Sequence, residues 1–544
     1  MVVSEGTPAG TRPAVFARQA SGLVRVAGSL DVFIFNVGLI SIGLAIAFNQ
    51  YLGLSSYPGA RPAVGMILTG LGMATVAATI YYFSVIFPRS GGTYVFLSRT
   101  MAPGIAFVLS FVEVVTQSYF AALGASLLAS LGVSPFLAVV GAMAHNQTML
   151  NWATATASPA GKLWIGLVVL LISAALMTLG TRRYFLVQRV LFAAAAAGTV
   201  VLAVVLIFGS RARFTTNLSN LTGLGYNDVI SKAEANGFTH SGFSLTSSAL
   251  FITLGYFALS PVWTSASFGG EIKRVQRSQL LGIFGALVAC TLVIGLFDLL
   301  AVGPIGDIFQ GAVAYNSING IAGGSTEAVV GASPFIQVLS SILAGSIPVA
   351  VIILATFALW NWFWIPALFL YSTRSMIAWS FDRVAPNRLG DVSRRFNTPV
   401  VAIWIFTGGA VVFLWLVSYG HLSLLTVGEA QVGMRMVVLL AAVIFPFRRR
   451  AMFEESPISR SRVFGVPTMV VTGVLAFAFL GLMEYLLWND SVAAGPLIRS
   501  PLPPEFWIVG GTLVFATIWY LAVTALQRRR GIDVHLAFKQ IPIE

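Results

Sequence analysis

Long apolar stretches separated by short polar segments dominate the hydrophobic pattern of the chain. An α-helix rises about 1.5 Å per residue, so about 20 apolar residues are needed to cross the hydrocarbon core of a bilayer. Twelve stretches approach or exceed that length, which predicts an all-α polytopic membrane protein with twelve transmembrane helices. The predicted spans are 30–48, 63–87, 104–131, 163–179, 186–208, 249–268, 280–302, 347–371, 400–417, 422–447, 466–488 and 506–526.

The sixth predicted span, 249–268, is interrupted near its middle by Gly255, Ser260 and Pro261. Proline has no N–H, so the carbonyl of Phe257, four residues earlier, loses its helical hydrogen bond. In lipid, a freed carbonyl is tolerated only where protein, water or a ligand satisfies it. The stretch is therefore either a simple proline kink or a broken helix at a binding site.

The first predicted span has a similar weak point, because Gly38, Ser41 and Gly43 lie at its centre. Each glycine weakens a helix by up to about 1 kcal/mol relative to alanine. The alternative is that these small residues allow a neighbouring helix to pack closely. If the first ten spans form two five-helix halves, spans one and six occupy corresponding positions. Interrupted helices in corresponding positions are typical of inverted-repeat transporters.

Composition and charge agree with a membrane protein and set its expected orientation. Of the 544 residues, 57% are hydrophobic and 9% are charged, whereas about a quarter of a soluble domain is charged. With the N-terminus in the cytosol, 25 of the 32 Lys and Arg residues fall in inner segments and 6 in outer ones. This bias predicts a multi-pass protein of the plasma (cell) membrane with both termini cytoplasmic. The basic face would meet anionic lipid, so we expect no nucleic acid partner.

Two of the loops assigned to the outside are long, residues 210–246 and 303–345. Loops of this length commonly contain short helices and act as lids. We expect short helices in both.

Three motifs lie in loops that the charge bias assigns to the cytosol. They read Pro88-Arg-Ser-Gly-Gly-Thr-Tyr94 after span two, Gly269-Gly-Glu-Ile-Lys-Arg-Val-Gln-Arg277 after span six, and Ser372-Thr-Arg-Ser-Met-Ile-Ala-Trp-Ser-Phe-Asp382 with Asn397-Thr-Pro399 after span eight. In this order and on one face, they resemble the inner loops of the amino acid–polyamine–organocation (APC) superfamily, amino acid permease type. The resemblance covers roughly residues 26–450, with Val275 where the family usually has proline.

The resemblance implies a LeuT-like fold, which is a five-plus-five inverted repeat, followed here by two further helices. It divides the chain into a cytosolic arm (1–28), a ten-helix transporter core (29–450), two additional helices (451–527) and a cytosolic tail (528–544). The substrate site would lie between spans one, three, six, eight and ten.

The resemblance also implies how a substrate is held. Backbone amides at the span-one break bind the carboxylate in family members, and carbonyls of span six meet the amino group. Phe257 falls where some members place an aromatic gate. Two departures are Gly43-Leu-Ala in place of the family's Gly-Ile-Phe, and Ala195 where some proton-coupled members have lysine. The positions implied to bind substrate are Gly38, Ile40, Ser41, Ile42, Gly43, Tyr256, Phe257, Ala258 and Ser260.

Ionisable and amide side chains inside spans are costly and are candidates for coupling. Glu113 lies about ten residues into span three, where apolar surroundings would favour its protonated form. We interpret it as a proton-coupling residue or as a carboxyl hydrogen-bonded to a neighbouring helix. Thr356 and Asn361 of span eight are candidates to face span one and hold a coupling proton or sodium ion.

The other charged residues in or beside spans receive structural interpretations. Glu429 and Arg435 of span ten lie on different helix faces, so we expect no direct pairing. Glu429 either contacts a cationic substrate or has a structural role facing the lid. Asp298 and Glu484 fall near outer span ends, where we expect water. Glu271 and Lys273 of the second motif would fasten cytoplasmic helix ends.

No nucleotide-binding loop, zinc motif or nucleophile elbow is visible in the sequence, so we predict no cofactor, no bound metal and no enzymatic activity. The leading hypothesis is a secondary active transporter for amino acids or related amines, driven by protons or sodium. An exchanger for amino acids or polyamines is the alternative within that class. A membrane-embedded enzyme or a channel is the alternative of another class.

Overall fold

The computed structural model describes residues 23–422, 426–489, 502–532, 534 and 538. Within these residues it is a bundle of helices with one short hairpin, β1 (Arg462–Val463) paired antiparallel with β2 (Val466–Pro467). Twelve helical segments are long and apolar enough to cross a membrane. The all-α, polytopic fold predicted from the sequence is therefore confirmed.

Nine of the twelve spans are continuous helices or helices with a local change of pitch. In chain order these nine are α3 (Pro62–Ile86), α5–η1–α6 (Pro103–Leu127, Leu128–Val133, Ser134–Met143), α8 (Pro159–Thr178), α9 (Thr181–Phe208), α14–η4–α15 (Val275–Gln279, Leu280–Phe284, Gly285–Val302), α19 (Ile347–Phe381), α20 (Val400–Ser418), α23 (Thr468–Asn489) and α24 (Pro504–Arg529). Another, α21 (Thr426–Arg448), begins four residues later than predicted, after residues 423–425, which lie outside the described part of the chain.

The first and sixth spans are broken. The first consists of α1 (Ser29–Ile40) and α2 (Ile42–Ser56), and the sixth of α12 (Leu245–Leu250), α13 (Ile252–Leu259) and the 3₁₀ turn η2 (Thr264–Ser267). The third span is longer than predicted and reaches Met143, because a π-helical turn, η1, carries the helix past Ser134 and Pro135.

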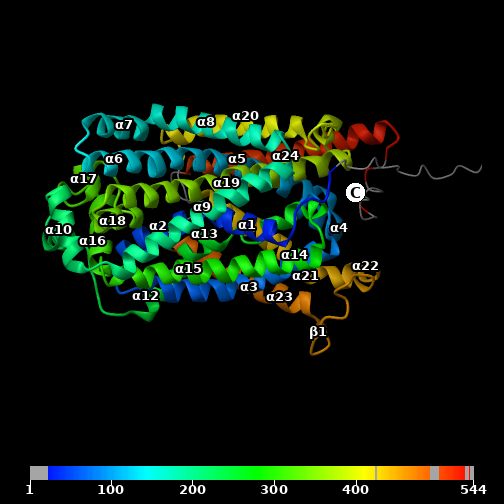
Figure 1. The fold of residues 1–544 in the computed structure, drawn as a ribbon. Helices are drawn as coiled ribbons and strands as arrows, with labels where there is room; N and C mark the ends of the chain where they lie inside the picture. The colour runs from blue at the N-terminus through cyan, green and yellow to red at the C-terminus, as the bar shows by residue number, and fades with distance from the viewer. Residues whose placement is uncertain (1–22, 423–425, 490–501, 533, 535–537, 539–544) are drawn as a thin grey trace, which may run out of the picture.

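Short helices gather at the two ends of the bundle (Figure 1). One end, called here the α16 end, carries α10 (Arg211–Thr222), α11 (Tyr226–Ala235), α16 (Asp307–Ile318), α17 (Thr326–Val330) and α18 (Ile336–Ala344). These helices occupy the two long loops, as predicted. The opposite end, called the α4 end, carries α4 (Gly92–Thr100), α14 and α22 (Arg450–Glu454). The remaining short elements are α7 (Gln147–Ala157), η3 (Gly269–Glu271) and η5 (Asn387–Gly390).

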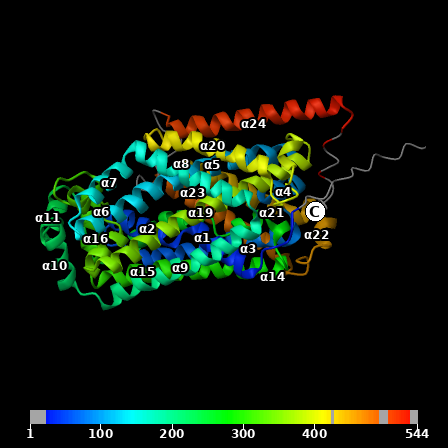
Figure 2. The same ribbon diagram turned by 45° about the horizontal axis from the view of Figure 1, so that its top comes forward.

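The last two spans lie on the outside of the bundle. α23 packs against α21 and α3, and α24 packs against α5 and runs along one edge of the molecule (Figure 2). Large apolar side chains such as Trp507, Ile518 and Leu521 of α24 are exposed. A membrane protein presents such a surface to lipid, where it costs nothing to leave apolar groups uncovered.

The three sequence motifs meet at the α4 end. Gly91 and Gly92 have φ angles of 118° and 44°, in the left-handed region that favours glycine. The Gly91 N–H donates to the carbonyl of Ser267 over 2.8 Å. A Cβ on Gly92 would lie 3.0 Å from the Cα of Ser267, and one on Gly91 would lie 2.7 Å from the Cβ of Ala378. The glycines therefore bring the ends of spans two, six and eight into backbone contact.

Buried ion pairs join the same spans at this end. Arg374 of α19 donates from Nε to Glu271 Oε1 over 2.6 Å, and its Nη2 contacts Glu271 Oε2 and the hydroxyl of Thr181. Both charged side chains are at most 1% exposed. Arg99 of α4 makes a bidentate pair with Asp382, over 2.6 and 3.1 Å. The predicted role of Glu271 in fastening helix ends is confirmed.

Two further contacts complete this closure. Tyr94 donates its hydroxyl to Asp382 over 2.9 Å, and burial, together with the negative charge of Asp382, raises the pKa of Tyr94 well above its usual value. Arg189 of α9 donates twice to Asp31 at the start of α1, over 2.6 and 2.7 Å. The α4 end of the bundle is thus held shut by contacts among spans one, five, six and eight.

Candidate functional site

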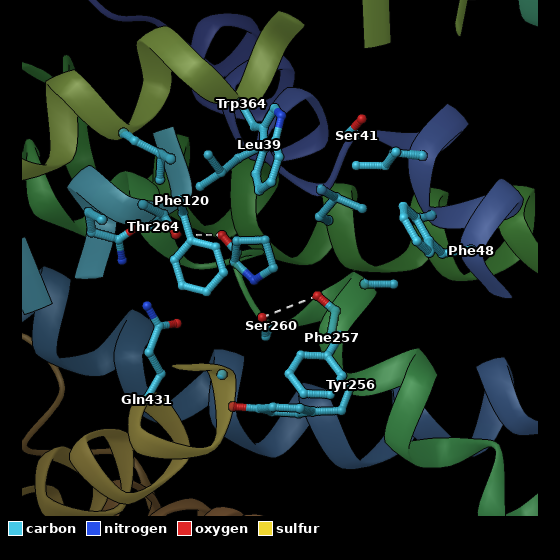
Figure 3. A pocket seen from close by; sticks show the side chains of 18 of the residues that line it. Leu39, Ser41, Phe48, Phe120, Tyr256, Phe257, Ser260, Thr264, Trp364 and Gln431 are labelled. Atoms are coloured by element: carbon cyan, nitrogen blue, oxygen red, sulfur yellow. Dashed lines mark hydrogen bonds between the residues drawn. The ribbon is translucent and has the colours of Figure 1, made fainter. Parts of the chain in front are cut away.

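The break in span one is a single residue. Ser41 has φ 54° and ψ 72° in the left-handed region, between the end of α1 and the start of α2. Its N–H donates to the carbonyls of Val37 and Gly38, which ends α1. Its hydroxyl donates to the carbonyl of Trp360 in α19 over 2.8 Å. The side chain is thus used to hold the break against span eight, and it points away from the cavity (Figure 3).

The break in span six begins where the sequence predicted it. Pro261 has no N–H, and the carbonyl of Phe257 accepts instead from the hydroxyl of Ser260 over 3.3 Å (Figure 3). The chain then turns, with Val262 N–H bound to the carbonyl of Leu259 and Thr264 Oγ1 donating to the carbonyl of Pro261 over 2.6 Å. Among the described residues, the carbonyl of Ala258 accepts no backbone hydrogen bond from beyond the break.

Both breaks border one cavity of about 180 Å³. α2 lines it with one face, because Ser41, Leu44, Ala45, Phe48, Asn49 and Leu52 follow the helical repeat. Glu113, Gln117 and Phe120 of α5 line another side, and Trp364, Leu368 and Tyr371 of α19 a third. The remaining wall comes from span six between Leu254 and Thr264 and from Gly428, Gln431 and Arg435 of α21. The cavity thus lies between spans one, three, six, eight and ten.

A polar network lies along the α21 side of this cavity. Arg435 donates to the hydroxyl of Tyr256 over 2.8 Å and to Gln431 Oε1 over 3.1 Å, and its guanidinium lies 5.4 Å from the ring centre of Trp263. None of the described carboxylates is within ion-pairing distance of Arg435. A charged group at this depth is therefore held only by neutral oxygens and an aromatic face.

The carboxyl of Glu113 borders the same small pocket as Arg435. The residue is 8% exposed, shares this small pocket with Thr93 as well, and lines the main cavity together with Tyr371. The hydroxyls of Thr93 and Tyr371 are themselves 3.4 Å apart. Glu113 therefore lies in the cavity wall, and the choice between proton coupling and a hydrogen bond to a neighbouring helix stays a prediction.

The comparison with protein families agrees with this arrangement. A family profile described as amino acid permease matches residues 28–524, nearly the whole chain. The chain belongs to the amino acid permease family. The match includes the last two spans, which extends it beyond the 26–450 covered by the motif resemblance. A search of curated proteins found no match. The permease is therefore a membrane transporter for amino acids or related amines.

The structure brings most of the predicted substrate-binding residues of the permease to the cavity. Ile40 and Ser41 line it from span one, and four residues line it from span six. In Figure 3, Tyr256, Phe257 and Ser260 lie together on one side of it, opposite Trp364 and Leu39. The predicted residues of span six that lie in this wall are Tyr256, Phe257, Ala258 and Ser260.

Gly38, Ile42 and Gly43 lie beside the cavity and not in its wall. A Cβ on Gly43 would lie 3.0 Å from Trp360 Cδ1, and one on Gly38 would lie 3.3 Å from Phe363 Cβ. The two glycines therefore allow α19 to pack closely against span one, the alternative weighed above. Ile42 and Gly43 belong to the first turn of α2, whose N–H groups have no partner within the helix.

The two span-eight candidates for ion coupling also lie away from the cavity of the permease. Thr356 packs against Gly198 of α9: a Cβ on this glycine would lie 1.7 Å from Thr356 Oγ1. Asn361 is fully buried and its Oδ1 accepts from Trp364 Nε1 over 3.2 Å. The two side chains therefore have different neighbours and do not form one site in this conformation.

One expectation about charged residues is wrong, and another is not tested. Asp298 was expected to be hydrated, but its residue is 6% exposed and neither carboxylate oxygen has a hydrogen-bond partner among the described residues. α16 packs along α2, and its Asp307 and Gln310 enclose one small cavity together with Asp298. The side chain of Glu429 lies outside the described part of the chain.

Sequence reasoning did not assign several cavity residues to the site. Gln117, Trp364, Tyr371, Gln431 and Arg435 are among them. A signal was present, since Glu113, Gln117 and Phe120 are spaced as neighbours on one helix face, and so are Gln431 and Arg435. Helical spacing groups such residues, but it does not tell which neighbouring helix the group faces.

Proposed function

We propose that the permease is a secondary active transporter that binds an amino acid or related amine between its two broken spans and works by alternating access. One observation carries the proposal: the breaks at Ser41 and at Ser260–Pro261 border the same cavity. Backbone donors and acceptors freed by two breaks are costly in a membrane unless a ligand or other polar group satisfies them. Substrate binding supplies such partners.

The two breaks offer opposite chemistry to the substrate. The start of α2 presents N–H groups and the positive end of a helix dipole, which suits a carboxylate. The end of α13 presents carbonyls, including those of Phe257 and Ala258, which suit an ammonium group. An amino acid carries both groups on one carbon, so it can bridge the breaks. A polyamine has no carboxylate and would use only the carbonyl side.

We assign proton coupling to Glu113. When its carboxyl is ionised, it offsets the positive charge of Arg435, and when it is protonated, the cavity carries an uncompensated positive charge. Protonation therefore strengthens the attraction between the cavity and a substrate carboxylate, which links proton binding to substrate binding. The interaction between these two groups across the cavity wall supports the assignment.

The described conformation corresponds to one state of the transport cycle. Ion pairs close the α4 end, while the cavity extends along α2 from Ser41 to Leu52, toward the α16 end. We assign the α4 end to the cytosol of the plasma membrane, because it carries the inner Lys and Arg residues. The cycle would open this end after closing α10 and α16–α18 over the other.

Counterflow in proteoliposomes tests the proposal. Vesicles are loaded with one member of a panel of acidic, neutral and cationic amino acids and polyamines, and uptake of the same labelled solute is followed. We expect saturable counterflow of at least one member, and accumulation under an inward proton gradient. No counterflow of any member would contradict the function, and uptake that never saturates would indicate a channel. A requirement for internal solute under a proton gradient would identify an exchanger.

A further inference from the structure

A second buried carboxyl lies outside the substrate cavity. Asp298 is the fourteenth residue of α15, so it lies about 6 Å from the end of that helix at about 1.5 Å per residue. Neither of its oxygens meets the geometry of a hydrogen bond within the described residues. An ionised carboxylate without a partner in such a place costs several kcal/mol.

The neighbours of Asp298 are amides and not cations. The closest interaction is with Gln50 of α2, which is 3% exposed and whose amide has no other partner in the described chain. Gln310 of α16 borders the same small cavity and has a free Oε1. This cavity measures about 10 Å³, which is room for about one water molecule. The site is therefore polar and small, and no described cation forms an ion pair with Asp298.

The charged groups around Asp298 are already engaged. Arg211 of α10 donates to the carbonyls of Val302 and Gly303 at the end of α15. Arg61, before α3, forms an ion pair with Asp307 at the start of α16, and both border the small cavity. α3 and α13 contain no Asp, Glu, Lys, Arg or His. The charged residues of α1 and α9, Asp31, Arg182, Arg183 and Arg189, lie near the α4 end. No described cation therefore neutralises Asp298.

The position of Asp298 connects it to the substrate cavity through one helix. The residues of α2 that line that cavity lie on one face, whereas Gln50 follows the lining residue Phe48 by two residues, or about 200° around the helix at about 100° per residue. Leu54 on the same opposite side borders the small cavity. α2 thus contacts the substrate with one face and the Asp298 site with the other.

We propose that Asp298 is a second proton-binding site, and that its protonation sets the position of α2. A neutral carboxylic acid suits this small buried pocket and can donate to an amide oxygen of Gln50 or Gln310. Loss of the proton leaves a buried unpaired charge, which the permease relieves by moving α2 and admitting water. A metal cation is less suited, because Arg61 borders the same small cavity.

Infrared difference spectroscopy of the purified permease tests the site without any substrate. At neutral pH we expect a carboxylic acid C=O band that shifts in D₂O and is lost in Asp298→Asn. Asp307→Asn is the matched control, because that carboxyl borders the same cavity but is ion-paired, so the band should stay. A spectrum in which Asp298→Asn removes no such band would overturn the proposal. If a second carboxylic acid C=O band is present, its loss in Glu113→Gln would assign that band to Glu113.

Substrate binding tests the link to α2, which rests on the proposed function. Asp298→Asn keeps the size of the neutral acid, so we expect its substrate Kd to lose the part of the pH dependence that Asp298 supplies. Coupling between two sites typically amounts to about 5- to 150-fold. An unchanged pH profile would overturn the link. A Na⁺ dependence at fixed pH that disappears in Asp298→Asn would identify a metal site and overturn the proton assignment. If no solute is transported, the infrared result still decides the site.

Discussion

At the residue scale, the contact between Phe257 and Gly428 gives the most specific prediction about substrate binding. A Cβ on Gly428 would lie 2.3 Å from Phe257 Cε1, so α21 approaches the span-six break only because this residue is glycine. The ring end can move, so Gly428→Ala should displace Phe257 without unfolding the permease. We expect substrate Kd to rise about tenfold, or about 1.4 kcal/mol, with a similar rise for Phe257→Ala.

Gly433→Ala is the control for this prediction. It lies on the same helix, and a Cβ there would have no neighbour within 4 Å. Equilibrium binding of the labelled substrate and thermal unfolding, measured on all three variants, separate a local from a global effect. Affinity that stays at the wild-type value in Phe257→Ala would remove this residue from the site.

A second residue-scale prediction concerns Glu113. Glu113→Gln keeps the size of the side chain and its contacts with Tyr371 and Thr93, but it cannot bind or release a proton. We expect counterflow to continue, while accumulation driven by a pH gradient falls to background. Glu505→Gln is the control, since Glu505 is also buried, at 2% exposure, but lies on α24 away from the cavity. Gradient-driven accumulation that survives in Glu113→Gln would exclude the coupling role.

At the element scale, the break in span one depends on the backbone of Ser41. A β-branched residue at φ 54° is strained by roughly 1–3 kcal/mol, whereas glycine adopts this angle freely. We expect Ser41→Val to lower the thermal stability and abolish counterflow. Ser41→Gly should retain counterflow, because it loses only the hydrogen bond to Trp360. Equal stability of the two variants would show that the left-handed angle is not what holds the break.

Span one also shows which features of a helix break can be predicted from the sequence and which cannot. The Gly38–Gly43 segment predicted a break there, and the structure has one. The sequence suggested the glycines as the weak points, yet the left-handed residue is Ser41, held by Trp360 from a helix more than 300 residues later. The break at Pro261 could be predicted because its cause is local: proline lacks the N–H that would bond a carbonyl of the same helix. The effect of Ser41 depends on tertiary contacts that no local pattern contains.

At the scale of the whole molecule, the number of spans followed from hydrophobic length, but the neighbours of each span did not. Asp298 is an example: its place near a span end predicted water, but the residue is buried beside a small cavity that Asp307 and Gln310 of α16 also border. Arg435 is another, since its contact with Tyr256 joins spans ten and six. Packing between spans decides which polar residues share a site.

The last prediction concerns the closure of the α4 end. Glu271→Gln leaves Arg374 buried beside a neutral amide, and breaking a buried pair in this way typically costs about 3–5 kcal/mol. This cost falls on the closed state, in which Arg374 is 0% exposed. We therefore expect the variant to favour the conformation open at the α4 end.

Cysteine accessibility measures this shift. Cys290 is the only cysteine and is buried. A Cys290→Ser background can therefore carry one reporter, Ser265→Cys. Ser265 lies in span six where this span contacts α1, on the α4 side of the breaks. A membrane-impermeant thiol reagent added from the α4 side should label the reporter faster in Glu271→Gln than in the parent. Glu454→Gln is the control: it breaks an exposed pair with Arg450 at the same end, and such pairs contribute about 0–1 kcal/mol. Equal labelling in Glu271→Gln and Glu454→Gln would mean that the buried pair does not govern the opening of this end.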